Sequence, residues 1–340
     1  MINVYFYKTT TDDSSELSKI MRKMVETLVE KEGVSLEKKV PIKVHFGEKG
    51  NTTYIKAPTY EGVLDYFEEE GVESAFIETN VLYRGSRTNA TEHTALAKEH
   101  GFIRVPIIIA DGEIGEAIWE VPINGKIFDK AYLGKAYGDY DQLLVVAHFK
   151  GHSQAGFGGA LKQLAMGCAS RRGKLAQHST ISPLVNEEKC VSCGICAGAC
   201  DYNAITIDPV AKIDSDKCVG CAGCIAVCPV EAIRNAWDAE DFLYRVAEYA
   251  YAAGKDKKSL YVNLLFNVTE LCDCVGKPMD LVAENIGVFV STDPVALDTA
   301  CLDALQNNHS EKLFDDGRET LKYVEELGLG QREYNLVEVN

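Results

Sequence analysis

The stretch Cys190-Val-Ser-Cys193-Gly-Ile-Cys196-Ala-Gly-Ala-Cys200 returns 28 residues later as Cys218-Val-Gly-Cys221-Ala-Gly-Cys224-Ile-Ala-Val-Cys228. An Ala-Ile pair follows each copy at the same offset, beginning at Ala204 and at Ala232. The two copies hold eight of the 12 cysteines in this 340-residue chain. Glycine and alanine fill most of the gaps, and long apolar periodicity is missing. Residues 187–235 are therefore expected to form a small unit of their own.

Both copies follow the spacing C-x2-C-x2-C-x3-C. Three thiolates at i, i+3 and i+6 can surround one iron–sulfur cubane, while the fourth points away and reaches the cubane of the other copy. The small residues between them let backbone N–H groups approach the sulfurs. The predicted ligands are Cys190, Cys193, Cys196 and Cys228 for cluster 1 and Cys218, Cys221, Cys224 and Cys200 for cluster 2.

Two structural zinc sites are the alternative interpretation, because zinc also takes four thiolates. Zinc ribbons use cysteines in pairs, however, and leave the third cysteine at i+6 without a role. The repeat resembles that of bacterial two-cluster ferredoxins, including Pro229 after the last cysteine. Asp201 stands where the first copy would carry proline and replaces no ligand. The resemblance implies two [4Fe-4S] clusters, one of them in an altered environment.

On both sides of the repeat, short β-branched runs alternate with helical periodicity, which predicts βαβ units. Strands are expected over residues 2–7, 42–46, 74–77, 105–110, 143–148, 259–267 and 287–291. Helices are expected between Ser14 or Ser15 and Gly33, after Asp293, and over residues 60–70, 90–100, 241–253 and 311–327.

These elements predict an α/β fold. A Rossmann-like, mostly parallel sheet domain would be built from residues 1–186 and 236–340, with an α+β ferredoxin-like 2[4Fe-4S] domain inserted at residues 187–235. Two independent α/β domains on either side of the insertion are the alternative, because they would produce the same alternation.

Composition narrows the classes of function. The chain carries 51 acidic against 35 basic side chains, a net charge of −16, which repels nucleic-acid backbones. No apolar run reaches the ~18 residues of a membrane span, and the N-terminus lacks the pattern of a signal peptide. We expect a cytoplasmic protein, in which clustered cysteines indicate metal. Its expected partner is a redox protein or a small-molecule substrate, and its oligomeric state stays open.

A second candidate site follows the strand that ends at His148, since ligands of α/β folds bind outside the carboxyl ends of the strands. A glycine-rich loop there lacks the spacing of a phosphate-binding P-loop, and a tight turn with locally bonded histidines is the alternative. Arginines in another loop after a strand could clamp a carboxylate or phosphate. The candidate catalytic residues are His148, His152, Lys162 and His178, and the candidate cofactor-binding residues are Arg84, Arg87, Gly156, Gly158 and Gly159.

Cys272-Asp273-Cys274 comes directly after another expected strand. Two thiolates at one point would make half of a third metal site for zinc, nickel or iron, completed by imidazole. Two buried, inert thiols are the alternative. Cys301 is expected in a helix core, and Cys168 is left open.

Four polar residues at three further strand ends are weaker candidates. They are His45, Glu48, Asp111 and Asp293. Asp293-Pro294 alone is a good helix start, with the aspartate as N-cap.

Over nearly its whole length, the chain resembles the iron–sulfur centre proteins of the domain-of-unknown-function 362 family. Besides the cysteine repeat, the matching stretches begin at His45, Thr79, His148, Gly156, Cys272 and Ser291. This resemblance implies the inserted cluster domain and no particular reaction. A shorter segment is similar to nickel-pincer lactate racemases, which implies that Lys162 anchors a cofactor, His178 binds nickel and His152 moves a proton.

Three hypotheses follow. The first is an iron–sulfur oxidoreductase in which two [4Fe-4S] clusters exchange electrons with a site in the α/β domain. The second is a non-enzymatic, ferredoxin-like electron carrier or assembly factor. The third is a metal- or cofactor-dependent isomerase that resembles the nickel-pincer racemases.

Overall fold

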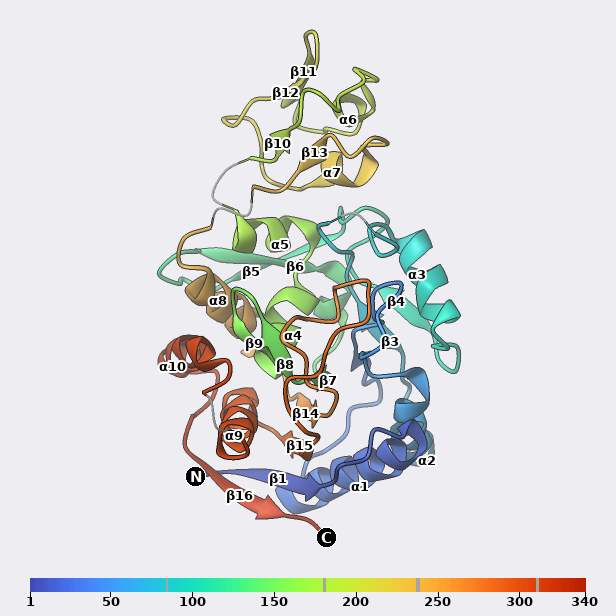
Figure 1. Ribbon diagram of the computed structural model, residues 1–340, viewed down its shortest axis with the longest axis vertical. Helices are drawn as coiled ribbons and strands as arrows, with labels where there is room; N and C mark the ends of the chain where they lie inside the picture. The colour runs from blue at the N-terminus through green and yellow to red at the C-terminus, as the bar shows by residue number, and fades with distance from the viewer. Residues whose placement is uncertain (84, 180–181, 237–238, 310–311) are drawn as a thin grey trace.

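A central sheet of eight strands organises the computed structural model, which describes residues 1–83, 85–179, 182–236, 239–309 and 312–340 (Figure 1). Its strands, in order across the sheet, are β16 (Tyr334–Glu338), β1 (Ile2–Lys8), β15 (Gly287–Ser291), β14 (Leu260–Leu265), β7 (Leu144–His148), β2 (Ile42–Lys43), β3 (Phe76–Glu78) and β4 (Ile107–Ile109). β15 runs antiparallel to β1 and β14, and the other neighbouring pairs are parallel. The expected α/β class and mostly parallel sheet are confirmed, and strands from both sides of the cysteine repeat share this sheet.

Side chains of the strands alternate between two apolar cores, as the pleat requires. Val145 of β7 belongs to one core, whereas its neighbour Val146 belongs to the other. The core of Val146 is covered by α1 (Ser14–Glu32), α2 (Glu61–Glu69) and α3 (Ala90–Glu99). The core of Val145 is covered by α4 (Ala160–Cys168), α8 (Phe242–Gly254), α9 (Pro294–Asn307) and α10 (Arg318–Leu327). Among the described residues, every helix is too short or too polar to cross a membrane.

Several expected boundaries shift by a few residues. The cap of α1 is Asp13, whose carboxylate accepts hydrogen bonds from Ser15 N and Glu16 N, rather than Ser14 or Ser15. Gly33 ends α1 as expected, in the left-handed region at φ 62°.

Two hairpins were not predicted from the sequence. They are β5 (Ile118–Pro122) with β6 (Lys130–Gly134), and β8 (Lys150–His152) with β9 (Gly156–Gly158). Residue 311, where the last helix was expected to begin, lies outside the described part of the chain.

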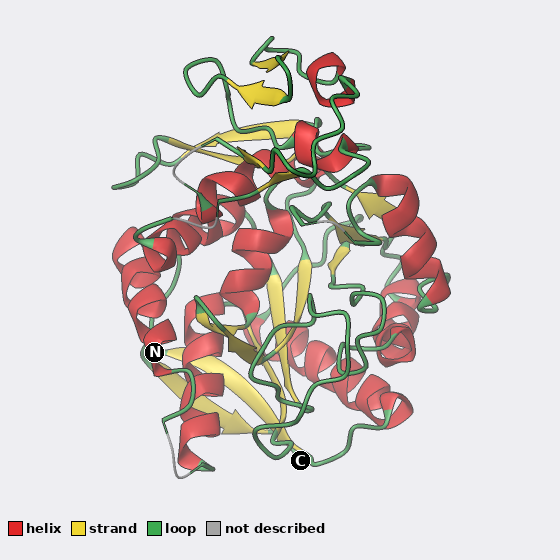
Figure 2. Cartoon of the chain, turned by 45° about the horizontal axis from the view of Figure 1, so that its top comes forward, coloured by secondary structure: helices red, strands yellow, loops and turns green. Residues whose placement is uncertain are grey.

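The cysteine repeat folds as a small lobe at one end of the molecule (Figures 1 and 2). Its elements are β10 (Leu184–Val185), α6 (Ile195–Gly198), β11 (Ile205–Ile207), β12 (Ala211–Ile213), α7 (Gly223–Val227) and β13 (Ile233–Arg234). A shift of 28 residues along the sequence brings α6 onto α7 and β11 onto β13. The lobe therefore has two β-α-β halves, β10-α6-β11 and β12-α7-β13. β10 pairs with β13 and β11 with β12, so each half pairs with the other.

The start of α4 is held by a carboxylate from another helix. Asp298, buried on α9, accepts hydrogen bonds from Ala160 N at 2.8 Å and Leu161 N at 2.9 Å. Asn263 Nδ2 donates a third at 2.7 Å. A Cβ on Gly159 would lie 2.4 Å from Asp298 Oδ1, so glycine is required at this approach. Asp298 therefore supplies the N-terminal cap that α4 lacks in its own sequence.

We predict that Asp298→Ala lowers the free energy of unfolding by about 3 kcal/mol, because three buried donors lose their acceptor. Urea unfolding followed by circular dichroism measures this. Asp12→Ala, at an exposed position before α1, is the matched control and should leave the midpoint unchanged. Equal midpoints for the two variants would contradict the capping role.

Candidate functional site

A cavity of about 530 Å³ opens at the carboxyl edge of the parallel strands. His45 follows β2, Thr79 follows β3, His148 ends β7 and Cys272 follows β14, and all four line it. The chain leaves β2 toward β3 and β4 and then returns to β7 on the other side of β2. Such a change of direction leaves a crevice between the loops of neighbouring strands, the usual ligand site of this architecture.

Most of the candidate residues meet in this cavity. Those that line it are His148, His152, Lys162, His178, Arg87, Gly158, Gly159, Cys272 and Cys274. Gly156 does not line the cavity: it turns the β8–β9 hairpin at φ 72° and packs where a Cβ would lie 2.4 Å from Gly317 N. Arg84 lies outside the described residues.

Asp273 is the buried anion of the site. Its carboxylate lies 2.9 Å from His148 Nδ1 and 3.1 Å from Lys150 Nζ. Burial alone would raise the pKa of Asp273, but the positive charges of His148 and Lys150 outweigh it and hold the pKa well below its usual value. His148 Nε2 donates to Phe266 O at 2.7 Å, so both ring nitrogens of His148 are engaged.

His152, Lys162 and His178 form a second group in the cavity. Both imidazoles stack on Phe242, with centroid distances of 6.2 Å for His152 and 5.0 Å for His178. His152 Nδ1 accepts from Ala155 N at 3.0 Å, which places the ring proton on Nε2. Burial, with Lys162 nearby, lowers the pKa of His152 well below its usual value and that of His178 to about 3, so both rings are neutral near pH 7.

Lys162 differs from the other cations because no described residue forms a hydrogen bond or ion pair with it. Burial, followed by repulsion from Lys150, lowers the pKa of Lys162 to about 7. The ammonium and amine forms are then both populated at neutral pH. A group of this kind can donate and accept protons in a reaction.

Arg87 is already held by the protein. Its Nε donates to Glu48 Oε2 at 3.1 Å, its Nη1 to His45 Nε2 at 3.0 Å and its Nη2 to the Tyr83 hydroxyl. Burial, together with the charge of Arg87, lowers the pKa of His45 well below its usual value. Arg87 therefore fixes the loop that follows β2 and adds positive charge to the cavity wall.

Four charged residues of the site were not predicted from the sequence. They are Lys150, Lys174, Glu78 and Asp273. Lys150 lies two residues beyond His148, and Lys174 one helical turn before His178, so their spacing from the two predicted histidines was the available signal. With these residues, the lining holds four basic side chains, Arg87, Lys150, Lys162 and Lys174, and the carboxylates Glu78 and Asp273.

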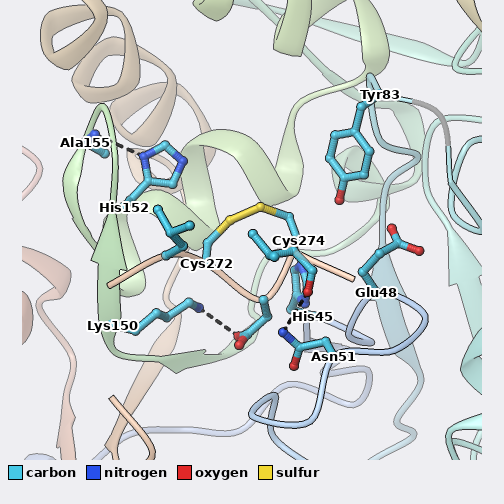
Figure 3. The surroundings of a disulfide bond; sticks show 12 residues. His45, Glu48, Asn51, Tyr83, Lys150, His152, Ala155, Cys272 and Cys274 are labelled. Atoms are coloured by element: carbon cyan, nitrogen blue, oxygen red, sulfur yellow. Dashed lines mark hydrogen bonds and ion pairs between the residues drawn. A yellow bond between two sulfur atoms is a disulfide. The ribbon is translucent and has the colours of Figure 1, made fainter. Parts of the chain in front are cut away.

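Cys272 and Cys274 form a disulfide in the cavity wall (Figure 3). Val275 N donates to Cys272 O at 3.0 Å, so the backbone turns here and both side chains reach one side, with Cα atoms 5.3 Å apart. Within the described part of the chain, no group of three or more His, Cys, Asp or Glu gathers around a point suited to one metal ion. The third metal site stays a prediction.

The eight cysteines of the lobe divide into two groups. One small cavity is lined by Cys190, Cys193, Cys196 and Cys228, and another by Cys200, Cys218, Cys221 and Cys224. Backbone N–H groups point at three of these sulfurs: Ala211 N at 3.4 Å from Cys190, Ala204 N at 3.4 Å from Cys200 and Ala232 N at 3.2 Å from Cys228. Cys168 and Cys301 are buried apart from them, on α4 and α9, and the expected core position of Cys301 is confirmed.

The helix α5 (Arg171–His178) lies between the lobe and the cavity. Leu175 packs in the core of the lobe, and a Cβ on Gly220 would lie 3.4 Å from its Cδ2. On the same helix, Lys174 and His178 line the cavity. Leu82 belongs to both the core of the lobe and the cavity lining. Only one layer of side chains therefore separates the two.

Arg171 opens this helix and is fully buried. Its Nη1 donates to Thr88 O at 2.7 Å, whereas Nε and Nη2 have no hydrogen-bond partner among the described residues. Burial lowers the pKa of Arg171 to about 10, against the opposing influence of Asp111 and of the thiols of Cys224 and Cys221. A buried cation with free donors thus stands beside the second group of cysteines.

We predict that Lys162 makes the free energy of unfolding depend on pH between 7 and 10.5. In this window the unfolded chain binds a proton that the folded chain does not, so the free energy of unfolding falls as the pH is lowered from 10.5 to 7, with a slope of up to about 1.4 kcal/mol per pH unit. Urea unfolding at pH 7 and pH 9 should show a larger loss in the wild type than in Lys162→Met, which keeps the contribution of Lys174, a second buried lysine with a pKa lowered to about 8. Lys19→Met, at an exposed position of α1, should behave as the wild type does. The same pH dependence in all three proteins would show that Lys162 titrates normally.

The model of one protein family, described as Domain of unknown function (DUF362), matches residues 40–303. No curated protein matches the sequence. The solved structures that match this chain include a protein from Thermotoga maritima, with 10% identity and a TM-score of 0.44, and the lactate racemase apoprotein from Thermoanaerobacterium thermosaccharolyticum, with 15% identity and a TM-score of 0.39. The matches cover 94% and 95% of this chain but only 60% and 58% of theirs.

Proposed function

The chain belongs to the DUF362 family, and from its own residues we propose that it is an iron–sulfur oxidoreductase. Two [4Fe-4S] clusters in the lobe exchange electrons with the cavity of the α/β domain. When bound, each cluster supplies one-electron transfer. The residues of the chain hold the clusters, line the path between lobe and cavity, and move protons there.

The observation that carries this proposal is the crossed grouping of the eight cysteines. Each small cavity of the lobe is lined by three cysteines of one copy and by the fourth of the other. These are the two ligand sets expected from the spacing of a two-cluster protein. Zinc ribbons use cysteines in pairs and leave the third cysteine of each copy without a role, so the crossed sets suit two cubanes better than two zinc ions.

The two predicted cluster positions differ in their surroundings, and this difference suggests the route of electron transfer. Around cluster 1, Cys193 is exposed and the apolar side chains of Val191, Ile195 and Val230 face solvent. Around cluster 2, Arg171 and Leu175 of α5 close the site toward the cavity. Electrons would therefore enter or leave through a redox partner near cluster 1, and cluster 2 would exchange them with the cavity.

The cavity is suited to a small anionic substrate. Its four basic side chains outnumber its two carboxylates, and His152 and His178 are neutral. Lys162, with a pKa of about 7, is the residue that would transfer the proton accompanying electron transfer. A carrier without a substrate would have no need for this arrangement, which favours an oxidoreductase over the carrier or assembly factor.

One observation favours a second candidate, a cofactor-dependent isomerase. Lys162, His152 and His178 converge in one cavity, the arrangement that a covalently anchored metal cofactor would require. Intact-mass spectrometry of the native protein distinguishes the candidates. A stable adduct on Lys162 would favour the isomerase, and an unmodified Lys162 would favour the electron-transfer reaction.

We predict about eight irons and eight acid-labile sulfides per chain in protein purified without oxygen. Cys221→Ala should lose about four of each, since Cys221 belongs to cluster 2 alone. Cys301→Ala, in the core of α9, is the control and should keep all eight. Metal analysis with circular dichroism as a test of folding measures this. Two zinc ions per chain, or iron unaffected by Cys221→Ala, would refute the cluster assignment.

We also predict that Arg171→Met lowers the midpoint potential of one cluster by an amount on the order of tens of millivolts, because a buried positive charge favours the added electron. A redox titration followed by electron paramagnetic resonance measures both clusters. Arg172→Met is the control, since the Arg172 guanidinium lies over the Tyr132 ring at 3.8 Å instead. Unchanged potentials in Arg171→Met, with full iron content, would remove Arg171 from the path.

A further inference from the structure

We propose that Cys272 and Cys274 are a redox-active pair, the two-electron centre at which the cavity receives electrons from the clusters. The inference rests on the proposed function for its source of electrons. It assigns the pair a role as disulfide and dithiol in place of the third metal site.

The disulfide has little to do for stability. It joins cysteines only two positions apart, and a cross-link restrains the unfolded chain less as the loop that it closes becomes shorter. It also lies in the wall of the main cavity, where both cysteines contribute to the lining. A bond that adds little stability and faces a ligand cavity is better explained by chemistry than by structure.

The loop that carries the pair is held independently of the disulfide. Asp273, between the two cysteines, is fixed by His148 and Lys150, and its backbone carbonyl accepts a hydrogen bond from Glu48 N at 3.2 Å. On the far side, Gly276 packs so closely that a Cβ would lie 2.6 Å from Lys49 O. The two sulfurs therefore stay next to each other when the bond between them is broken.

The surroundings favour thiolate chemistry. Figure 3 shows His152 and Lys150 on one side of the disulfide and Tyr83 and Glu48 on the other. Lys150 and Lys162 line the same cavity, and nearby cations stabilise thiolate over thiol. Arg87 adds a further fixed positive charge to the same wall.

The position of the disulfide is consistent with the proposed electron transfer from cluster 2 to the cavity. The same cavity is lined by Lys174 and His178 of α5, and by Leu82, which also packs in the core of the lobe. The disulfide therefore shares this cavity with α5, the element that also contacts the lobe. A one-electron relay that ends at a two-electron centre can deliver both electrons to a substrate together.

The proposed reaction is the reduction of the disulfide by the two clusters. The Cys272–Cys274 sulfur–sulfur bond breaks, and the pair accepts two electrons, one from each reduced cluster, and two protons. Two thiols form, and both clusters return to their oxidised state. The protons come from solvent through Lys162, whose charged and neutral forms coexist near pH 7. In the opposite direction, the same step reduces the clusters and closes the disulfide.

Counting electrons tests this inference. Iron-loaded protein is titrated with dithionite without oxygen, and the uptake is read from the visible absorbance. One electron per cluster and two per disulfide predict about four electrons per chain. Cys272→Ser with Cys274→Ser should take up about two at unchanged iron content. Cys274→Ser alone should behave in the same way if the double variant does not fold. Cys301→Ser is the control and should take up about four.

Labelling identifies the residues that accept the extra electrons. With iodoacetamide and peptide mass spectrometry, Cys272 and Cys274 should be protected before the titration and labelled after it. The result that overturns the inference is about two electrons in every protein with eight irons present, or a bound metal that is lost together with Cys272 and Cys274. In both cases the proposed function stands. Protein without iron would overturn the proposed function and this inference with it.

Discussion

The buried carboxylate of Asp273 is the interaction on which the site depends. It lies in the loop after β14 and pairs with His148 at the end of β7 and Lys150 at the start of β8. Removing one member of such a pair leaves a buried charge, at a cost on the order of 3–5 kcal/mol. Thr53 Oγ1, 3.4 Å from Asp273 Oδ1, brings in the loop after β2. The carboxyl ends of three parallel strands are thus tied to one anion, with Cys272 and Cys274 on either side of it.

Helix α5 gives this site its connection to the rest of the molecule. Its residues contact two environments, because positions four apart lie above one another on a helix. Lys174 and His178 face the cavity, whereas Arg171 and Leu175 contact the lobe of the cysteine repeat. The function that we propose needs electrons to cross this one element. A buried guanidinium near Cys221 and Cys224, with two donor atoms that no described residue accepts from, is also hard to explain as packing alone.

The sequence predicted best those features that depend on local spacing. Alternating strands and helices indicated the parallel sheet, and the position of His148, His152, Lys162 and His178 after one strand brought them to one cavity. The partners of these residues were missed, because Asp273 is 125 positions from His148 along the chain. The disulfide between Cys272 and Cys274 depends on the turn closed by Val275, which places their Cα atoms 5.3 Å apart, and the sequence does not show this turn. Asp298 as the cap of α4 also depends on a contact between segments 138 positions apart in the chain. The boundaries 187 and 235 of the inserted domain stay predictions.

Iron-edge anomalous diffraction from crystals grown without oxygen tests the central claim most directly. The account predicts two peaks of equal strength in the lobe: one among Cys190, Cys193, Cys196 and Cys228, and the other among Cys218, Cys221, Cys224 and Cys200. The second peak should lie beside Arg171. Peaks at the zinc edge instead, or iron bound only in the cavity of the α/β domain, would contradict it.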